Sequence, residues 1–401
     1  MLHEINADFQ NALSRLGRPE RYFLLIDQGG TNVRLRIYPA DRRWTWPQRA
    51  WNIGHMVELR RNDIRSDADL YALLAEAARA LCLGTENAPE IRVVMACAGA
   101  VSAQRDSVEI TNWPGQPVIT LASLDVALKR APVLMLNDVE AAAFGLVALE
   151  EFNAWPDRAC ELTASGLQHM SRRADAPKRR AQNKALLVPG TGIGTGSIVY
   201  ASKLSGGKRS AQAEVVPSEV QHVPVSAITA QQYALIEWLR QNRTGGSPPC
   251  FEAIVSGKGL ESVYEFLLQQ PAAGGAPHQA SPQIAAADER AAAIAQAAQS
   301  DPPDPICREA LSLYYAFCGR LAQTLALAVK AFGGVYLAGD TTSHNWEFLP
   351  NSPYLQSFLT NHKQATLLKE FPLYLLDKPG INLDGALYAA CRRWYLRAGT
   401  P

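Results

Sequence analysis

The sequence lacks a strong excess of charge of either sign. Its 401 residues include 39 Lys and Arg against 38 Asp and Glu, so the formal net charge is only +1. A chain without a large positive charge has no long-range field that would attract nucleic acid or an acidic membrane surface. We therefore expect neither nucleic acid nor a membrane among its partners.

Long apolar runs and a targeting segment are also missing. No run reaches the roughly 20 apolar residues of a membrane-spanning helix, and the first residues lack the basic start and apolar centre of a signal peptide. The seven cysteines are odd in number and show no paired metal spacing. Most lie in apolar stretches, as Cys97 and Cys318 do, which favours reduced thiols in the cytoplasm.

Two familiar nucleotide-binding motifs are absent from the glycine-rich segment Pro189-Gly-Thr-Gly-Ile-Gly-Thr-Gly196. It lacks the Lys-Ser or Lys-Thr of a P-loop, and its spacing differs from the dinucleotide fingerprint Gly-x-Gly-x-x-Gly. Strand-like runs flank it. The segment is therefore either an ordinary hairpin turn or a turn whose backbone N–H groups bind phosphate.

The sequence contains instead a regular alternation of strand-like and helix-like runs. With 47% hydrophobic and 19% charged residues it has a globular composition, and its length allows two domains. In the first part we expect strands at 22–26, 33–38, 91–97 and 133–136, and helices at 67–83, 124–130 and 139–149. This alternation predicts an α/β layered domain.

A second α/β stretch begins at Ala185. We expect strands at 185–188, 196–200, 335–338 and 372–375, helices at 288–298, 306–331 and 352–359, and a final helix from Asp384. The basic stretch 164–184 is interpreted as a solvated surface loop, with a site for an anionic partner as the alternative. The Ala- and Pro-rich stretch 271–305 is interpreted as a surface excursion.

The segment Phe23-Leu-Leu-Ile-Asp-Gln-Gly-Gly-Thr-Asn-Val-Arg-Leu-Arg-Ile37 is the most informative one. An apolar strand leads into Asp27, a glycine pair and a threonine, and a second strand follows. Glycines let the backbone approach a polyphosphate closely, and a carboxylate can hold Mg²⁺ directly or through water. On its own the segment is equally compatible with an ordinary hairpin turn.

Polar residues end another strand at Met135-Leu-Asn-Asp138. Asn137 and Asp138 are good helix caps, which is the simple interpretation. Alternatively, a carboxylate at the carboxyl edge of a parallel sheet lies where α/β proteins bind ligands. There Asp138 would accept a proton from a substrate hydroxyl.

Two carboxylates and an imidazole suit the recognition of a sugar. Glu219 and His222 lie close in sequence, and Glu252 precedes the segment Ala-Ile-Val-Ser-Gly. Such groups accept directional hydrogen bonds from neighbouring hydroxyls. A structural role for His222 is the alternative, and no cysteine cluster follows it to indicate a metal site.

The segment Phe332-Gly-Gly-Val-Tyr-Leu-Ala-Gly339 ends a helix, forms a strand and ends on glycine. This is an ordinary αβ unit. Its last glycine would also let a flat adenine ring lie against the backbone.

Taken in order, these motifs resemble those of the bacterial ATP-dependent glucokinases of the actin-like ATPase (sugar kinase, ribonuclease-H-like) superfamily. The resemblance spans residues 21–395. The matching segments are Asp27-Gln-Gly-Gly-Thr-Asn, Thr111-Asn-Trp, Asn137-Asp138, Gly190-Thr-Gly-Ile-Gly, Glu219 with His222, Glu252 with Ser256-Gly257, Phe332-Gly-Gly-Val with Ala338-Gly339, and Pro379-Gly-Ile with Gly385-Ala.

The resemblance implies a two-domain α/β fold of the actin-like ATPase (ribonuclease-H-like) type with an interdomain cleft. Residues 1–148, with a helix returning from 380–401, would form a small domain, and residues 149–379 a large one. The helix beginning at Asp138 and the final helix would connect the domains at a hinge. The sequence is also compatible with a homodimer.

The resemblance further implies phosphorylation of glucose at its 6-hydroxyl by ATP with Mg²⁺. Asp138 would be the general base. The sugar contacts would be Asn112, Asn137, Glu219, His222 and Glu252. The ATP contacts would be Asp27, Gly29, Gly30, Thr31, Gly190, Thr191, Gly192 and Gly339, with Asp27 near Mg²⁺, directly or through water.

The sequence departs from the family pattern at three places. Gln28 replaces a small or apolar residue, Ser218-Glu-Val-Gln-His222 replaces Gly-Glu-Gly-Gly-His, and Asp340 replaces a glycine. A kinase for another hexose or an amino-sugar is therefore one alternative, and a catalytically silent sugar-binding regulator is another. Related repressors carry an N-terminal helix-turn-helix and a cysteine-rich zinc segment. Only about 20 residues precede the first strand here, so we expect an enzyme.

Overall fold

The computed structural model describes residues 11, 14, 21–29, 32–39, 57–61, 63–86, 88–111, 113–151, 159–169, 181–200, 213–270, 280–376 and 380–394. They form two compact units, one from Met1–Ala154 with Gly380–Pro401 and one from Trp155–Pro379. No helix in the described part of the chain combines the length and the apolar character that a bilayer crossing requires.

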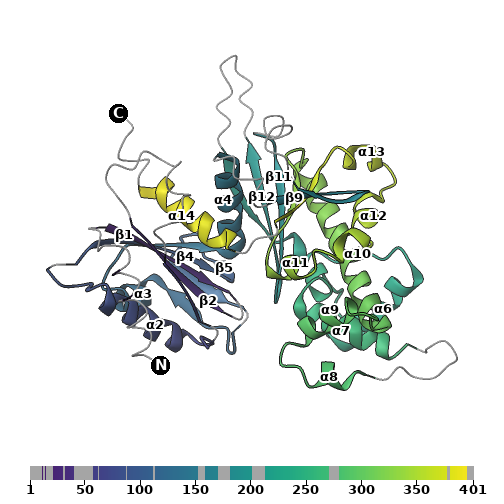
Figure 1. Ribbon diagram of the computed structural model, residues 1–401, viewed down its shortest axis with the longest axis horizontal. Coiled ribbons are helices and arrows are strands. Elements are labelled where there is room, and N and C mark those ends of the chain that lie inside the picture. The colour runs from purple at the N-terminus through teal and green to yellow at the C-terminus, as the bar shows by residue number, and fades with distance from the viewer. Residues whose placement is uncertain are drawn as a thin grey trace, which may run out of the picture. The chain divides into compact units, whose positions relative to one another are not determined.

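The first unit is built on a five-stranded sheet (Figure 1). Its elements are β1 (Arg21–Gln28), β2 (Val33–Pro39), β3 (Val57–Arg61), α2 (Asp67–Ala80), β4 (Glu90–Cys97), β5 (Gly99–Val101), β6 (Ser107–Ile110), β7 (Val118–Thr120), α3 (Leu121–Ala127), β8 (Val133–Asn137), α4 (Asp138–Glu151) and α14 (Ile381–Trp394). The strand order is β3-β2-β1-β4-β8, and β5-β6-β7 form a smaller sheet. The strands β1, β2 and β3 are antiparallel, whereas β1, β4 and β8 run parallel.

Alternating side chains of β1 enter two different hydrophobic cores. Leu24 and Ile26 pack in the core that includes residues of α2 and α3. Phe23 and Leu25 pack on the opposite face with residues of α14, among them Leu383. Successive residues of a strand point to opposite faces, so a strand covered on both sides needs an uninterrupted apolar run. This explains why the segment before Asp27 is apolar throughout.

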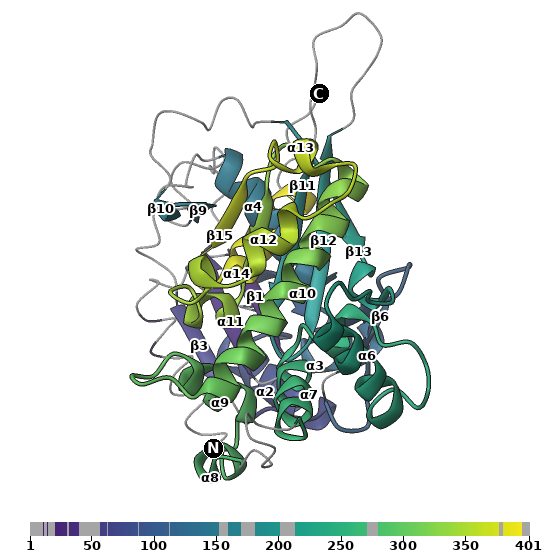
Figure 2. The same cartoon turned by 90° about the vertical axis from the view of Figure 1, so that its right-hand side faces the viewer.

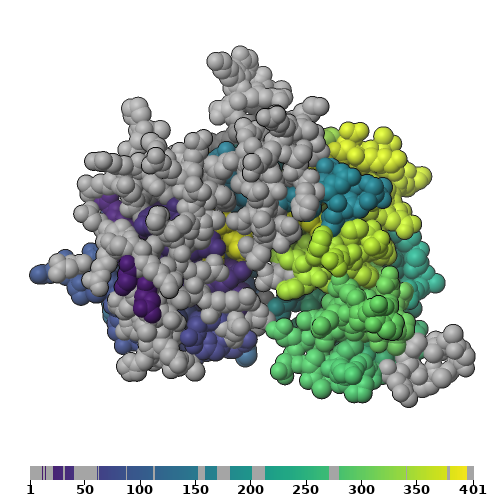
Figure 3. Space-filling view, viewed as in Figure 1, coloured from purple at the N-terminus to yellow at the C-terminus, as the bar shows by residue number. Residues whose placement is uncertain are grey.

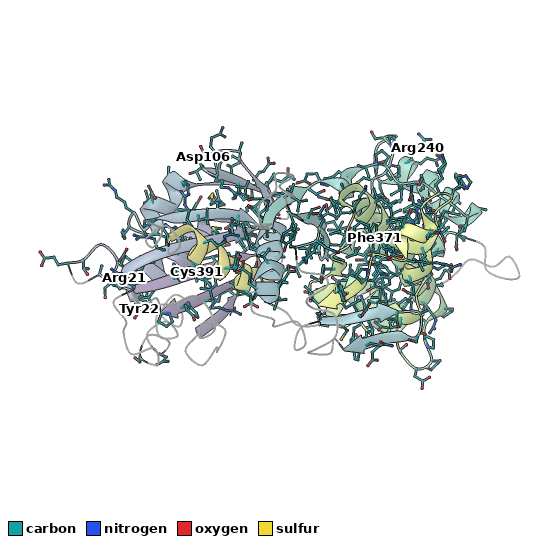
Figure 4. All side chains as sticks on the ribbon, turned by 90° about the horizontal axis from the view of Figure 1, so that it is seen from above. Arg21, Tyr22, Asp106, Arg240, Phe371 and Cys391 are labelled. Atoms are coloured by element: carbon teal, nitrogen blue, oxygen red, sulfur yellow. The ribbon has the colours of Figure 1, made fainter. Side chains whose placement is uncertain are left out.

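Helices α4 and α14 cross at two glycines. A Cβ atom added to Gly385 would lie 1.7 Å from the carbonyl oxygen of Ala141, and one added to Gly145 would lie 2.5 Å from Cγ1 of Ile381. Neither position accepts a side chain unless the helices move apart. Figure 4 labels Cys391 on α14, which packs over β1 and β4.

The second unit repeats this strand order within a seven-stranded sheet. Its strands are β9 (Ala159–Thr163), β10 (Gly166–His169), β11 (Lys184–Pro189), β12 (Ile193–Tyr200), β13 (Ala213–Ser218), β14 (Val335–Leu337) and β15 (Leu373–Leu376). The order is β10-β9-β15-β14-β11-β12-β13. Its part β13-β12-β11-β14-β15 has the same strand directions as β3-β2-β1-β4-β8. A glycine turn follows the middle strand of this order in each unit, β1 in the first unit and β11 in the second.

Helix α10 (Pro305–Val329) is the central helix of the second unit's core (Figure 2). Asp304 caps it, because its Oδ1 accepts hydrogen bonds from the N–H groups of Ile306 and Cys307. Figure 3 shows the surface of this unit in green to yellow, and Figure 4 labels Phe371 within it. The other helices are η2 (Val220–His222), α6 (Ala230–Asn242), η3 (Phe251–Ala253), α7 (Gly257–Leu268), α8 (Pro282–Ala285), α9 (Arg290–Ala298), α11 (Asp340–His344), η4 (Leu349–Asn351), α12 (Tyr354–Leu359) and α13 (Ala365–Leu368).

Two expectations from the sequence are wrong. The final helix begins at Ile381 rather than at Asp384, and Asp384 forms a buried ion pair in its first turn with Arg36, at 2.8 Å. Part of the stretch 164–184, interpreted as a solvated surface loop, forms strand β10, which pairs with β9. Its polar composition fits an edge strand, which needs to bury little.

Candidate active site

Three parallel strands of the first unit end side by side. Gln28 of β1 lies opposite Cys97 of β4, and Cys97 lies opposite Asn137 of β8. Asp27 precedes this row in β1, and Asp138 follows it directly after β8. Ligands of α/β proteins bind at such carboxyl edges. The sheet thus brings the predicted general base to the same edge as the predicted phosphate turn.

The thiol of Cys97 lies buried within this row. Burial raises its pKa well above the ordinary value, and the carboxylates of Asp138 and Asp27 raise it further. Because the thiolate is the reactive form, we expect Cys97 to resist iodoacetamide in the native protein at neutral pH, whereas exposed Cys82 reacts. Mass spectrometry of the labelled protein tests this, and rapid native-state labelling of Cys97 would contradict it.

Asp27 is a buried carboxylate held by two side chains. Its Oδ2 accepts hydrogen bonds from Arg34, at 2.9 Å from Nε and 2.6 Å from a terminal nitrogen. Its Oδ1 accepts one from Nδ2 of Asn382, at 3.1 Å. Arg34 lies directly opposite Asp27 in the hairpin register, and Asn382 comes from the first turn of α14. The carboxylate is therefore fixed in orientation and its charge is balanced by Arg34.

The unexpected Gln28 has a clear place at this edge. It is fully buried, its Nε2 donates to the carbonyl oxygen of Gly29 at 2.8 Å, and its Oε1 accepts from the N–H of Ala98 at 3.2 Å. A buried amide with both ends bonded costs little. Gln28 links the first glycine turn to the end of β4.

Asn137 and Asp138 form the start of helix α4. The Oδ1 atom of Asn137 accepts from the N–H groups of Val139, at 2.9 Å, and Glu140, at 3.3 Å. Its Nδ2 donates to the carbonyl oxygen of Gly99, at 2.9 Å. The simple interpretation of Asn137 as an N-cap is therefore confirmed. Asp138 is half-buried, and its Oδ1 accepts from the N–H of Val139.

The glycine turn of the second unit is closed by its own backbone. The N–H of Gly190 donates to the carbonyl oxygen of Gly192 at 2.7 Å, and the N–H of Gly257 donates to that of Gly190 at 3.0 Å. A Cβ atom on Gly192 would lie 2.6 Å from Oε1 of Glu252, so a side chain there would displace the Glu252 carboxylate. Among the described residues, the N–H groups of Thr191 and Gly192 have no partner. These two groups can bind a phosphate oxygen.

Gly339 lies beside this turn, at the end of the neighbouring strand β14. Its φ is +96°, and a Cβ atom there would lie 2.9 Å from the carbonyl oxygen of Pro189. Both facts require glycine. The second unit therefore brings Gly190, Gly192 and Gly339 to one sheet edge.

Glu219, His222 and Glu252 form a row that we call the carboxylate–imidazole row. His222 Nε2 lies 3.4 Å from Oε2 of Glu219, and its Nδ1 lies 3.5 Å from Oε2 of Glu252. The three side chains are 69%, 52% and 36% exposed, respectively. Oε1 of Glu252 accepts from the N–H of Ile193, directly after the glycine turn, at 3.3 Å. Polar, solvent-accessible acceptors at this spacing suit adjacent hydroxyls of a sugar.

Some predicted contacts cannot be placed. Gly30, Thr31 and Asn112 lie outside the described residues, as does the side chain of Asp340. Among the residues that are described, no three His, Cys, Asp or Glu side chains gather to hold a metal ion.

Sequence reasoning missed Arg34 and Asn382 as partners of Asp27. The hairpin pattern contained a signal for Arg34, because a short turn pairs it with Asp27 across the two strands. Asn382 gave no signal, since only the tertiary fold brings it to this edge.

The strand order shared by the two units, with a glycine turn after β1 in the first and after β11 in the second, defines the fold of the actin-like ATPases, the class that includes the sugar kinases. A family model described as Glucokinase matches residues 24–393. The chain belongs to the glucokinase family, and it is an enzyme of that family.

Relatives and solved structures agree with this assignment. A glucokinase of Mesorhizobium japonicum is 27% identical over 389 residues, which cover 93% of this chain and 96% of that protein. The structure of glucokinase from Balamuthia mandrillaris in complex with glucose has a TM-score of 0.72 at 23% identity and covers 96% of this chain and 98% of its own. A ROK family glucokinase from Streptomyces griseus, in complex with glucose and AMPPNP, has a TM-score of 0.55 at 17% identity and covers 93% and 99%.

Proposed function

We propose that this protein is an ATP-dependent glucokinase that phosphorylates the 6-hydroxyl of glucose. The carboxylate–imidazole row carries the proposal, because Glu252 faces His222 with one oxygen and the glycine turn with the other. A sugar-binding group in contact with a phosphate-binding turn suits phosphoryl transfer to a sugar. The Streptomyces griseus complex with glucose and AMPPNP supports ATP as the donor. Seven free cysteines, most of them buried, support a cytoplasmic location.

Asp138 is the proposed general base. The sugar oxygen O6 attacks the γ-phosphorus of ATP, the bond from that phosphorus to the bridging oxygen breaks, and ADP leaves. The proton of the hydroxyl passes to the Asp138 carboxylate. That carboxylate lies in the first turn of α4, directly after β8.

The phosphate contacts are proposed for the glycine turns and Asp27. The N–H groups of Thr191 and Gly192 would hold phosphate oxygens, and bound Mg²⁺ would supply neutralisation of their charge. Asp27 would hold the ion directly or through water, with Arg34 and Asn382 fixing the orientation of its carboxylate. Gly339 would border the adenosine.

An assay of ADP release tests the proposal. Purified protein with ATP and Mg²⁺ is given glucose, mannose, fructose, glucosamine or N-acetylglucosamine in turn. We expect the highest kcat/KM with glucose. Higher kcat/KM with another sugar would identify a different hexose or amino-sugar kinase, and absence of turnover with sugar binding retained would indicate a regulator.

Substitutions in the carboxylate–imidazole row should weaken sugar binding. Glu252→Gln and His222→Ala each remove an acceptor, and a hydrogen bond to a charged group contributes about 1.5–3 kcal/mol. We expect the KM for sugar to rise about tenfold or more, with the KM for ATP affected less. His362→Ala, at an exposed histidine of the same unit, is the control. Unchanged sugar affinity in both variants would place the sugar site elsewhere.

A further inference from the structure

The buried amide side chain of Gln221 lies, in the sequence, between Glu219 and His222 of the carboxylate–imidazole row. Gln221 is 5% exposed, although its sequence neighbours in the row, Glu219 and His222, are open to solvent. Its Nε2 donates to Oε2 of Glu219 at 2.5 Å. Its Oε1 accepts from Oγ1 of Thr195, at 2.6 Å, and Thr195 is 2% exposed. Thr195 belongs to β12, which starts directly after the glycine turn.

The chemistry fixes the direction of these two hydrogen bonds. An ionised carboxylate only accepts, so the amide nitrogen must face Glu219 and the amide oxygen must face Thr195. The threonine hydroxyl then donates its one proton to Gln221, at 2.6 Å, rather than to the carbonyl oxygen of Ser218, which lies farther away at 3.1 Å. The bond between Thr195 and Gln221 is buried and therefore strong, whereas the bond from Gln221 reaches out to the exposed Glu219. The result is a Thr195–Gln221–Glu219 relay anchored in the sheet.

The relay acts on a side chain that would otherwise be mobile. Glu219 is 69% exposed, and an exposed glutamate samples many rotamers that sugar binding would have to order. The same Oε2 atom lies 3.4 Å from Nε2 of His222, so the relay fixes Glu219 beside the imidazole. Fixing a binding group in advance lowers the cost of binding.

We propose that Gln221 is a positioning residue that fixes Glu219 for recognition of the sugar hydroxyls, and that Thr195 orients Gln221. The inference rests on the proposed function. This positioning role also explains why the chain has Gln221 at a position where the family pattern Gly-Glu-Gly-Gly-His has glycine.

The first test separates KM from kcat. Gln221→Leu keeps the approximate volume but removes both hydrogen bonds, and Thr195→Val removes the hydroxyl with little change of shape. We expect Gln221→Leu to raise the KM for glucose about tenfold, the equivalent of one lost hydrogen bond to a charged group, and Thr195→Val to raise it about fivefold, because the bond that it removes joins two neutral groups. The value of kcat and the KM for ATP should stay within about twofold, and Thr195→Ser, which keeps the hydroxyl, should restore most of the sugar affinity.

Gln232→Leu is a matched control. Gln232 is also buried in the second unit, at 6% exposure, and its Oε1 accepts from the N–H of Ile228 rather than contacting the row. This variant should lose stability without a change in the KM for glucose. If it raised that KM as much as Gln221→Leu does, a general structural effect would explain both and the proposal would be overturned.

A pH profile of Gln221→Glu gives a second readout. The new carboxylate faces Glu219, with His222 next to it and Glu252 beyond, so like-charge repulsion raises the pKa of one carboxyl of the pair. At low pH that carboxyl is protonated and donates in place of the amide. The ratio of variant to wild-type KM for glucose should therefore increase as pH rises. A ratio independent of pH would contradict the positioning role.

A measurement without substrate distinguishes this inference from the proposed function. In the sugar-free protein, the side-chain amide protons of Gln221 should be protected from exchange in NMR spectra, and Thr195→Val and Glu219→Ala should each reduce the protection. Absence of protection overturns the relay even if glucose is phosphorylated. If wild type phosphorylates no sugar, the proposed function fails and the recognition role of Gln221 fails with it.

Discussion

Asp138→Asn should lower kcat by about 10²–10⁴-fold, the range typical for loss of a general base. The amide keeps the size of the carboxylate, and its oxygen can still accept the N–H of Val139. The helix start should therefore stay intact. What the amide cannot do is accept the proton of the sugar hydroxyl, so glucose affinity measured by calorimetry should change little.

A matched control separates this loss from a general effect of charge. Asp125→Asn alters an exposed aspartate of helix α3 in the same unit and should leave kcat unchanged. If Asp138→Asn kept more than half of the wild-type turnover, the assignment of the base would be wrong.

Gly385→Ala should strongly destabilise the protein. The added Cβ atom would lie 1.7 Å from a backbone carbonyl of α4, and only separation of the two helices relieves that overlap. Overpacking of this kind costs about 3 kcal/mol, and the better helix propensity of alanine offsets about 1 kcal/mol. A net loss of about 2 kcal/mol lowers the melting temperature by about 4–8 °C.

Gly257→Ala is the control for this prediction. Gly257 is also helical, but a Cβ atom there would lie 3.6 Å from its nearest neighbours, an ordinary contact. Differential scanning calorimetry of both variants decides the matter. Equal melting temperatures for Gly385→Ala and the wild type would show that the crossing of α4 and α14 is not closely packed in solution.

The central strands of both units were predictable from the sequence. The run before Asp27 is apolar without alternation because both faces of β1 are covered, and that pattern is local in the chain. The hairpin around Gly190 was also predictable, because strand-like runs flank a glycine-rich segment that is short in the sequence. The edge strand β10 was missed, because the segment Gly166–His169 has a single apolar residue and gives no apolar pattern.

The candidate site was only partly predictable. The positions of Asn137 and Asp138 follow from one strand-to-helix junction, which the sequence indicates. The contacts of Glu252 with Ile193 and of Gln221 with Thr195 join separate segments of the second unit. No periodicity encodes such contacts, since they depend on how the sheet and the short helices η2 and η3 pack.

The late position of α14 in the sequence determines the order in which the protein is completed on the ribosome. Phe23 and Leu25 emerge early, but Leu383 and Leu387, which cover them, are made only after the whole second unit. At synthesis rates of about 5–20 residues per second, this delay is about 20–70 s. The second unit is continuous in sequence and can fold in that interval. During this time α14 does not yet cover the apolar face of the first sheet. The unit that is begun first is therefore finished last, and chaperones have a defined surface to protect until α14 leaves the exit tunnel.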